Sequence, residues 1–167
     1  HRIDWGTVGL SFDFLPNDAT LTALRGLLSR RSCAYSVPVG ARERLGGPPD
    51  AVELLSYRPG ERAVVRVSRG NQSVFAKLFA GKQHEELAAR LPVLQQDLQR
   101  RSTNLLLPPM LGHEPADGAV WLGAVAGRAA HDLLADDGTA RNTSKRIGAA
   151  LAQWHQLTPP PALATVT

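Results

Sequence analysis

The sequence predicts an α+β fold in which an antiparallel sheet is encoded ahead of most of the helices. Two observations indicate it: β-branched apolar runs separated by tight-turn residues between positions 51 and 79, and leucine-rich stretches at helical spacing after position 82. Strands grouped ahead of helices are typical of α+β folds rather than of alternating βαβ units. With 167 residues, the chain is long enough for one domain, or for one domain and part of another.

The composition is that of a globular protein. Apolar residues make up 43% of the chain and charged residues 20%, which is the usual balance for a packed core. No apolar run approaches the roughly 20 residues that a membrane-spanning helix needs, and no signal-peptide pattern opens the sequence. The single cysteine, Cys33, excludes an internal disulfide and fits a reducing compartment. We therefore expect a cytoplasmic protein without a membrane partner.

The positive charge raises the question of a nucleic-acid partner. The formal net charge is +4, but the arginines are spread along the chain, with adjacent pairs only at Arg30-Arg31 and Arg100-Arg101. Aromatic residues make up 5%, too few for an obvious base-stacking surface. Nucleic-acid binding is therefore a disfavoured hypothesis.

The first 45 residues are expected to form an extension that packs on the domain after it. Alternating apolar residues predict a strand from Ile3 to Phe14. Asp18 is expected to cap a helix from about Ala19 to Ser29, which carries a stripe of leucines. A second short strand is possible near Tyr35 to Val39.

Three successive strands are predicted after the break at Gly46-Gly47-Pro48-Pro49. Their connections contain Pro59-Gly60 and Gly70-Asn71, which favour tight turns, so the strands should pair as an antiparallel meander. The strands are expected over Ala51–Tyr57, Arg62–Ser68 and Ser73–Phe79.

The remaining chain combines helices with two further extended segments. A helix is expected from Lys82 to Gln99 because its leucines share one face, and Pro92 within it predicts a kink or a restart. An extended edge segment is expected at Leu105–Leu111, followed by a turn at Gly112–Gly118 and a strand at Ala119–Ala124. A helix is expected at Ala129–Leu134, and Thr143-Ser144 are expected to cap a last helix. A proline linker is expected at Pro159–Pro161.

Lys77 is the most informative single residue. Only three of the nineteen Lys and Arg residues are lysines, and this one lies in the middle of a predicted strand. Alternation places Lys77 on the same face as Phe75 and Phe79. An ammonium between two phenyl rings is costly to desolvate unless an anion meets it. The pattern therefore favours a phosphate-facing lysine, with an ordinary exposed lysine as the alternative.

Six short motifs, in this order, resemble one family. They are Y-R-P-G-E-R-A-V-V-R-V, V-F-A-K, a helix with Glu85-Glu86, L-P-P-M-L-G, W-L-G-A-V-A-G and I-G-A-A-L-A-Q-W-H. From about Ala51 to Leu157 the chain resembles the nucleotide-binding lobe of the aminoglycoside phosphotransferase family, within the protein-kinase-like fold. This implies a sheet of about five strands with a packed helix, and four regions: an extension at 1–45, the nucleotide-binding lobe at 46–122, a hinge at 123–128, and the start of a helical lobe at 129–167.

The resemblance implies roles for three side chains. Lys77 would contact the nucleotide phosphates, because a fixed ammonium offsets polyphosphate charge. Phe75, two residues earlier, would stack on adenine; a core phenylalanine is the alternative. A glutamate on the next helix would orient the lysine. Glu86 flanks the leucine face of that helix while Glu85 points away from it, so we favour Glu86. A solvated glutamate at a helix start is the alternative.

Backbone groups are implied at three further positions. Gly60 lies where related kinases place their phosphate-covering loop, although the full G-x-G-x-x-G is absent and the residue also suits a plain turn. At the hinge, the Gly123 carbonyl and the Val125 amide would pair with the adenine edge. A simple Gly-rich connection is the alternative there. No metal site is expected, because His84, His113 and His131 lack metal-ligand spacing.

Catalytic groups are missing from the sequence. The family supplies its base and magnesium ligands from a His-x-Asp-x-x-x-x-Asn loop and a later Asp, and neither is found in these residues. We therefore expect a fragment: the ATP-binding part of a small-molecule kinase that transfers the γ-phosphate to a hydroxyl of an aminoglycoside-like or other metabolite. ATP and Mg²⁺ would be its cofactors, and this chain alone would be inactive. The alternative is a non-catalytic nucleotide-binding or regulatory module.

Overall fold

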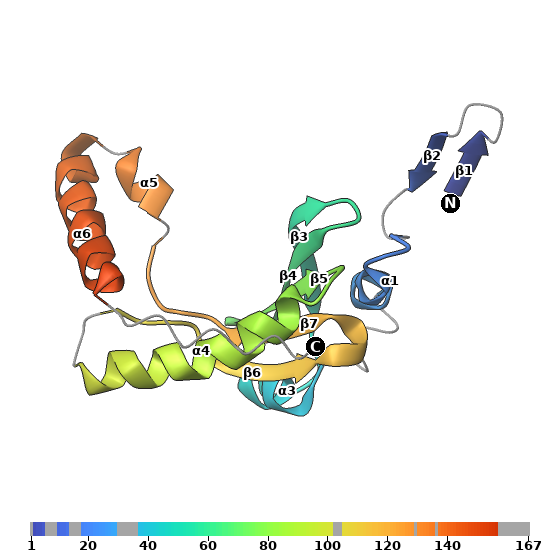
Figure 1. Ribbon diagram of the computed structural model, residues 1–167, viewed down its shortest axis with the longest axis horizontal. Coiled ribbons are helices and arrows are strands. Elements are labelled where there is room, and N and C mark those ends of the chain that lie inside the picture. Colours follow the sequence, from blue (N-terminus) through green and yellow to red (C-terminus); the bar gives the residue numbers. More distant parts are fainter. Residues whose placement is uncertain are drawn as a thin grey trace, which may run out of the picture. The chain divides into compact units, whose positions relative to one another are not determined.

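The computed structural model describes residues 2–5, 10–13, 18–29, 37–101, 105–128, 130–135 and 137–156 (Figure 1). Tyr35 and the expected linker at Pro159–Pro161 lie outside these residues. The chain divides into two compact units. One comprises His1–Ala89 with Pro108–Ala124, and the other comprises Arg90–Leu107 with Val125–Thr167.

The first unit is built on an open five-stranded antiparallel sheet, which confirms the predicted α+β class. The sheet order is β3-β4-β5-β7-β6. The expected meander is present, and its turns contain Gly60 and Gly70 at φ of 68° and 53°, a region that glycine enters without strain. The strands are β3 (Ala51–Arg58), β4 (Arg62–Arg69), β5 (Gln72–Phe79), β6 (Met110–Glu114) and β7 (Ala119–Gly123).

Two helices cover one face of this sheet. Helix α1 (Thr22–Leu28) packs against β3, and α3 (Val39–Leu45) packs against β5, β6 and β7. Every second residue of β4 and β5 enters this core, so the predicted alternation is confirmed. Trp121 of β7 is the largest fully buried side chain in it. The other buried members are Leu21, Leu24, Leu27, Val37, Ala41, Leu45, Ala63, Val65, Val67, Val74, Ala76, Leu78 and Ala119.

The N-terminal elements differ from two of the predictions. Instead of one strand from Ile3 to Phe14, the structure has a hairpin of β1 (Arg2–Trp5) and β2 (Leu10–Asp13), paired antiparallel. In the sequence, the alternating run contains glycines at positions 6 and 9, and glycine is disfavoured inside a strand. Val39, expected in a strand, begins α3. Pro38 presets the φ at the start of this helix, and Ala41 and Leu45 bury one helical face.

The edge strand β6 is longer at its C-terminal end than predicted. Gly112 was expected to open a turn but lies within β6, and the reversal occurs at a 3-10 turn, Pro115–Asp117, followed by Gly118. A Cβ at Gly112 would lie 3.0 Å from Pro38 Cγ. Gly112 is therefore explained by close packing rather than by turn geometry.

After the meander, the first two helices lie within one residue of their predicted bounds, and the last helix begins earlier than predicted. Helix α4 (Gln83–Arg100) continues through Pro92 without a restart. Helix α5 spans Ala130–Leu134 and α6 spans Asp137–His155. Thr143-Ser144, expected to cap the last helix, lie inside α6, where the Ser144 hydroxyl donates to the Ala140 carbonyl at 2.9 Å. A hydroxyl can bond the carbonyl four residues earlier, so these residues do not require a helix start. No helix in the described ranges is long and apolar enough to cross a membrane.

A buried carboxylate, Asp18, joins the start of α1 to the β3–β4 turn. One oxygen accepts from the Thr20 amide (2.9 Å), the Thr20 hydroxyl (2.6 Å) and the Leu21 amide (3.1 Å). The other accepts from the Tyr57 hydroxyl (3.0 Å) and the Gly60 amide (2.7 Å). The expected cap is thus displaced: Leu21 is the N-cap residue of α1, and Asp18 closes the turn before it.

Hydrogen bonding keeps Asp18 ionised in spite of its burial. The residue is 7% exposed. Burial acts to raise the pKa of the carboxyl, but hydrogen bonds from Thr20, Gly60 and Leu21 outweigh it and hold the pKa well below its usual range. The carboxylate therefore stabilises the fold in its charged form.

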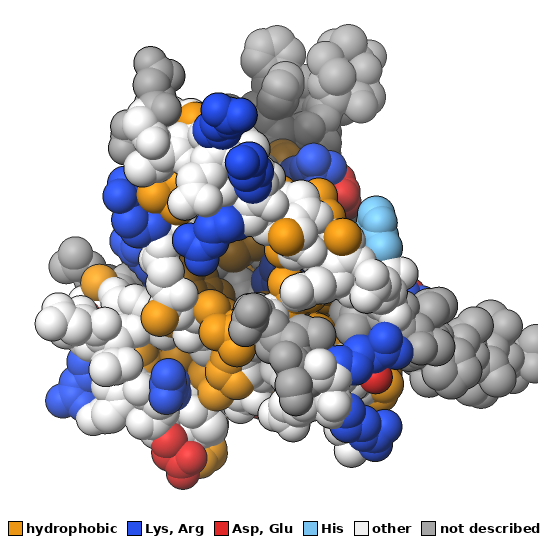
Figure 2. Space-filling model, turned by 90° about the vertical axis from the view of Figure 1, so that its left-hand side faces the viewer, with side chains coloured by type: hydrophobic (Ala, Val, Ile, Leu, Met, Phe, Trp, Pro, Cys, Tyr) orange, Lys and Arg blue, Asp and Glu red, His pale blue; other side chains and the backbone are white. Residues whose placement is uncertain are grey.

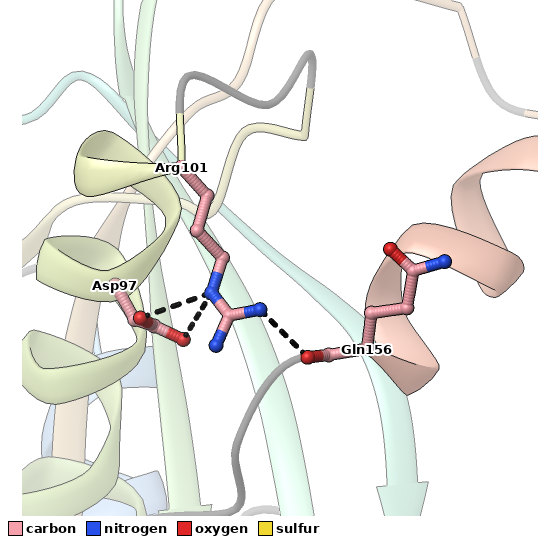
Figure 3. Close-up of polar contacts among 3 residues, drawn as sticks. All are labelled: Asp97, Arg101 and Gln156. Carbon is pink, nitrogen blue, oxygen red and sulfur yellow. Dashed lines mark hydrogen bonds and ion pairs between the residues drawn. The ribbon is translucent and has the colours of Figure 1, made fainter.

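In the second unit, Arg101 connects the ends of α4 and α6 (Figure 3). Its Nε lies 3.2 Å and 3.1 Å from the two carboxylate oxygens of Asp97, one turn back on α4. Its Nη1 donates to the Gln156 carbonyl at 2.8 Å, directly after α6. A guanidinium at this end of a helix also complements the negative end of the helix dipole.

We expect Asp18→Asn to lower the free energy of unfolding by about 2 to 4 kcal/mol at pH 7, because the amide NH₂ would face groups that are themselves donors. The folded-state pKa lies below the unfolded value of about 3.9, so the contribution is present above that value and lost as pH falls through the folded-state pKa. Urea unfolding at several pH values should show the two proteins converging between about pH 5 and 2. Asp50→Asn is the control, since Asp50 accepts one exposed bond, from Gly70.

We expect Arg101→Ala to lower the free energy of unfolding by about 1 kcal/mol, because the ion pair is only partly shielded from water. Arg100→Ala removes the neighbouring exposed arginine and serves as the matched control. Hydrogen exchange at the end of α6 should accelerate only in the Arg101 variant. Equal exchange in the two variants would contradict the connecting role of Arg101.

Candidate functional site

The sheet face opposite α1 and α3 carries the candidate site. Residues paired directly across antiparallel strands share a face, so the register Val64↔Lys77↔Val120↔His113 defines one row on this face. Phe75 and Phe79 lie on the same face, two residues before and after Lys77. The same register places two exposed arginines of β4 on this face, Arg62 opposite Phe79 and Arg66 opposite Phe75. The candidate face thus combines Lys77 and its apolar neighbours with two arginines at its β4 side.

Lys77 is half-buried in this row. Val120 beside it is fully buried, and Phe75 and Phe79 are half-buried. Within the described ranges, the Lys77 side chain forms no hydrogen bond or ion pair. A half-buried lysine whose ammonium has no protein partner is suited to receive an anion. No ion pair joins Lys77 to Glu86 in this structure, so Glu86 as the partner of Lys77 stays a prediction.

Helix α4 begins beside the same row. His84, in its first turn, is buried, and its Nδ1 lies 2.9 Å from Nε2 of His113 on β6. One of these nitrogens donates the proton that the other accepts, and the ring centroids are 5.2 Å apart. This contact holds the first turn of α4 near the candidate face. Glu85 and Glu86 follow His84 in that turn and are exposed.

Gly60, assigned to the phosphate loop, already has a partner for its amide. The turn between β3 and β4 directs this amide to Asp18, as described above. A phosphate contact at the same amide would have to replace a charge-assisted hydrogen bond of 2.7 Å. The turn therefore fits phosphate binding only if Asp18 moves or if other amides of the loop are used.

The two hinge residues have different surroundings. Gly123 ends β7, is buried, and donates its amide to the Pro109 carbonyl at 2.8 Å. A Cβ there would lie 2.7 Å from Pro109 Cγ, so packing alone accounts for this glycine. Val125 follows two residues later and is 43% exposed.

None of the six predicted site residues lines either of two cavities formed by described residues. One cavity, of about 250 Å³, lies in the first unit between α1 and β7 and is lined partly by Thr22, Gly26 and Trp121. The other, of about 790 Å³, lies in the second unit. Among the described residues, no group of three or more His, Cys, Asp or Glu side chains is placed to hold a metal ion.

Sequence reasoning missed two features that position this site. The link between Asp18 and Gly60 spans 42 residues, and the His84–His113 contact spans 29. Local pattern assigned Asp18 to a helix cap and gave the two histidines no role. A contact between distant residues has no local signal, so only the folded chain reveals it.

Gly118, in the β6–β7 turn, lies close to the backbone at the end of β5. Its carbonyl accepts from the Phe79 amide at 3.0 Å, and a Cβ would lie 2.4 Å from the Phe79 carbonyl oxygen. We expect Gly118→Ala to lower the free energy of unfolding by about 2 to 4 kcal/mol through strain and collision. Gly70→Ala should lower it by about 1 kcal/mol, because its positive φ is similar but the space around it is open. Denaturant unfolding distinguishes them, and equal losses would contradict the close approach.

Comparison with known proteins adds no relative: neither a scan against protein-family models nor a search of the curated proteins found a match to this chain.

Proposed function

We propose that this chain binds a nucleoside triphosphate, with Lys77 contacting the phosphates. The observation that carries the proposal is the half-buried residue Lys77, whose side chain has no partner among the described residues and which lies between Phe75 and Phe79 on one face of β5. Phosphate oxygens would supply a negative charge to pair with the Lys77 ammonium. Apolar neighbours strengthen this attraction by lowering the local dielectric.

The start of α4 supports the same proposal. The His84–His113 contact fixes the first turn of α4 beside the row that contains Lys77. Glu86 follows two residues later and is our candidate for orienting the Lys77 ammonium. A phenyl ring at Phe75 offers a stacking surface for a base. Gly123 and Val125 would supply backbone groups for the edge of that base.

The proposed reaction of the whole protein is transfer of the ATP γ-phosphate to a hydroxyl group of a small molecule, as the resemblance in sequence implies. Magnesium would offset phosphate charge in such a reaction. The His-x-Asp-x-x-x-x-Asn segment that would supply the base does not occur in these 167 residues. We therefore assign nucleotide binding, and no catalytic step, to the residues described here.

Lys77→Met tests the proposal while keeping the length and the apolar part of the side chain. We expect the affinity for MgATP, measured by titration with a fluorescent ATP analogue and by competition with ATP, to fall at least about tenfold, since a charge-assisted contact is lost. Lys82→Met is the matched control, because Lys82 is exposed in the turn before α4. Its affinity should stay unchanged.

Two results would refute the assignment. The first is equal affinity for ATP in the wild-type chain and the Lys77 variant, both shown to be folded by circular dichroism. The second is the absence of ATP binding to the wild-type chain. Adenosine in place of ATP should bind the wild-type and the Lys77→Met proteins equally, because it lacks the phosphates that Lys77 would contact.

A further inference from the structure

The second unit contains a groove that the proposed nucleotide site does not use. Its volume is about 790 Å³, within the usual range for a small-molecule site. Leu105 and Leu133 form part of its lining, and α6 supplies one continuous stripe. Thr143, Ile147 and Ala150 recur at helical spacing along that stripe.

The lining of this groove has a distinct charge pattern. Two of its residues are arginines, Arg128 and Arg146, both exposed, and none of its lining residues is acidic. Thr143, which is 9% exposed, adds a hydroxyl-bearing residue to the lining. Figure 2 draws one face of the molecule with Lys and Arg side chains in blue and hydrophobic side chains in orange.

We propose that this groove binds a small amphipathic carboxylate, with its apolar chain against Leu133 and Ile147 and its carboxylate between Arg128 and Arg146. Guanidinium groups bind carboxylates through paired, charge-assisted hydrogen bonds. A neutral apolar ligand would offer no negative charge to the guanidinium groups of Arg128 and Arg146. A cationic ligand would meet two like charges and no acid in the lining.

The proposal is independent of nucleotide binding. No residue assigned to the nucleotide lines this groove, and the groove lies wholly within the second unit. Failure of one assignment therefore leaves the other standing, and the two can be tested on the same protein with different ligands.

Octanoate is the first probe, used below its micelle concentration with the full chain. In amide NMR spectra we expect saturable shifts at Ala149, Ala150 and Gln153. Octylammonium, which has the same chain and the opposite charge, should bind at least about tenfold more weakly, and acetate should cause no saturable shift. Raising the salt concentration should weaken octanoate binding because the arginines are exposed.

Matched substitutions distinguish the contribution of the two arginine charges to octanoate binding from that of the shape of the groove. Arg128→Gln and Arg146→Gln should each weaken octanoate binding about tenfold. Arg141→Gln, an exposed arginine of α6 outside the lining, should leave it unchanged. Ala150→Leu should block the groove, whereas Ala152→Leu, on an exposed position of the same helix, should not.

Three results would overturn the proposal. They are the absence of saturable shifts with octanoate, equal affinity for octanoate and octylammonium, and unchanged affinity in both arginine variants. Equal affinities for the two amphiphiles would indicate a merely apolar surface. Because the arginines and Ala150 are probed separately, loss of folding in one variant does not prevent the test.

Discussion

The pairing register of β4, β5 and β7 is the constraint on which the candidate site depends. Strand side chains alternate between faces, so this register sends Val65, Ala76 and Trp121 together into the core. The same register places Lys77 on the opposite face, in a row with Val120. A slip of one residue would bury the ammonium under α1 and α3, which is far too costly without a partner. Core packing thereby fixes where the lysine can lie.

Asp18 is a second constraint, and it competes with one of the proposed ligand contacts. Its carboxylate ties the segment before α1 to the β3–β4 turn through both oxygens. The Gly60 amide is therefore used to stabilise the fold. Binding of phosphate by the Gly60 amide would therefore cost the turn a stabilising hydrogen bond. For this reason the nucleotide proposal rests on Lys77 rather than on Gly60.

Local pattern predicted well the elements whose periodicity matches their surroundings. The meander from β3 to β5 was found because turn residues and alternating apolar residues agree there. Local pattern gave a wrong prediction where the same residue type is found in two different structural settings. Gly112 was interpreted as a turn, but it permits close packing against Pro38. Thr143-Ser144 were interpreted as a cap, but hydroxyl groups are also accommodated inside a helix.

The sequence by itself determined the α+β class, the meander, and the face of β5 on which Lys77 lies, because these follow from residue periods within a few positions of one another. The six predicted site residues were chosen largely by resemblance, and their joint role stays a prediction. Only the tertiary structure decided that His84 meets His113, that Asp18 binds the Gly60 amide, and that α5 and α6 enclose a groove with two arginines. These contacts join residues far apart in the chain, and long-range packing, which no local pattern encodes, brings them together.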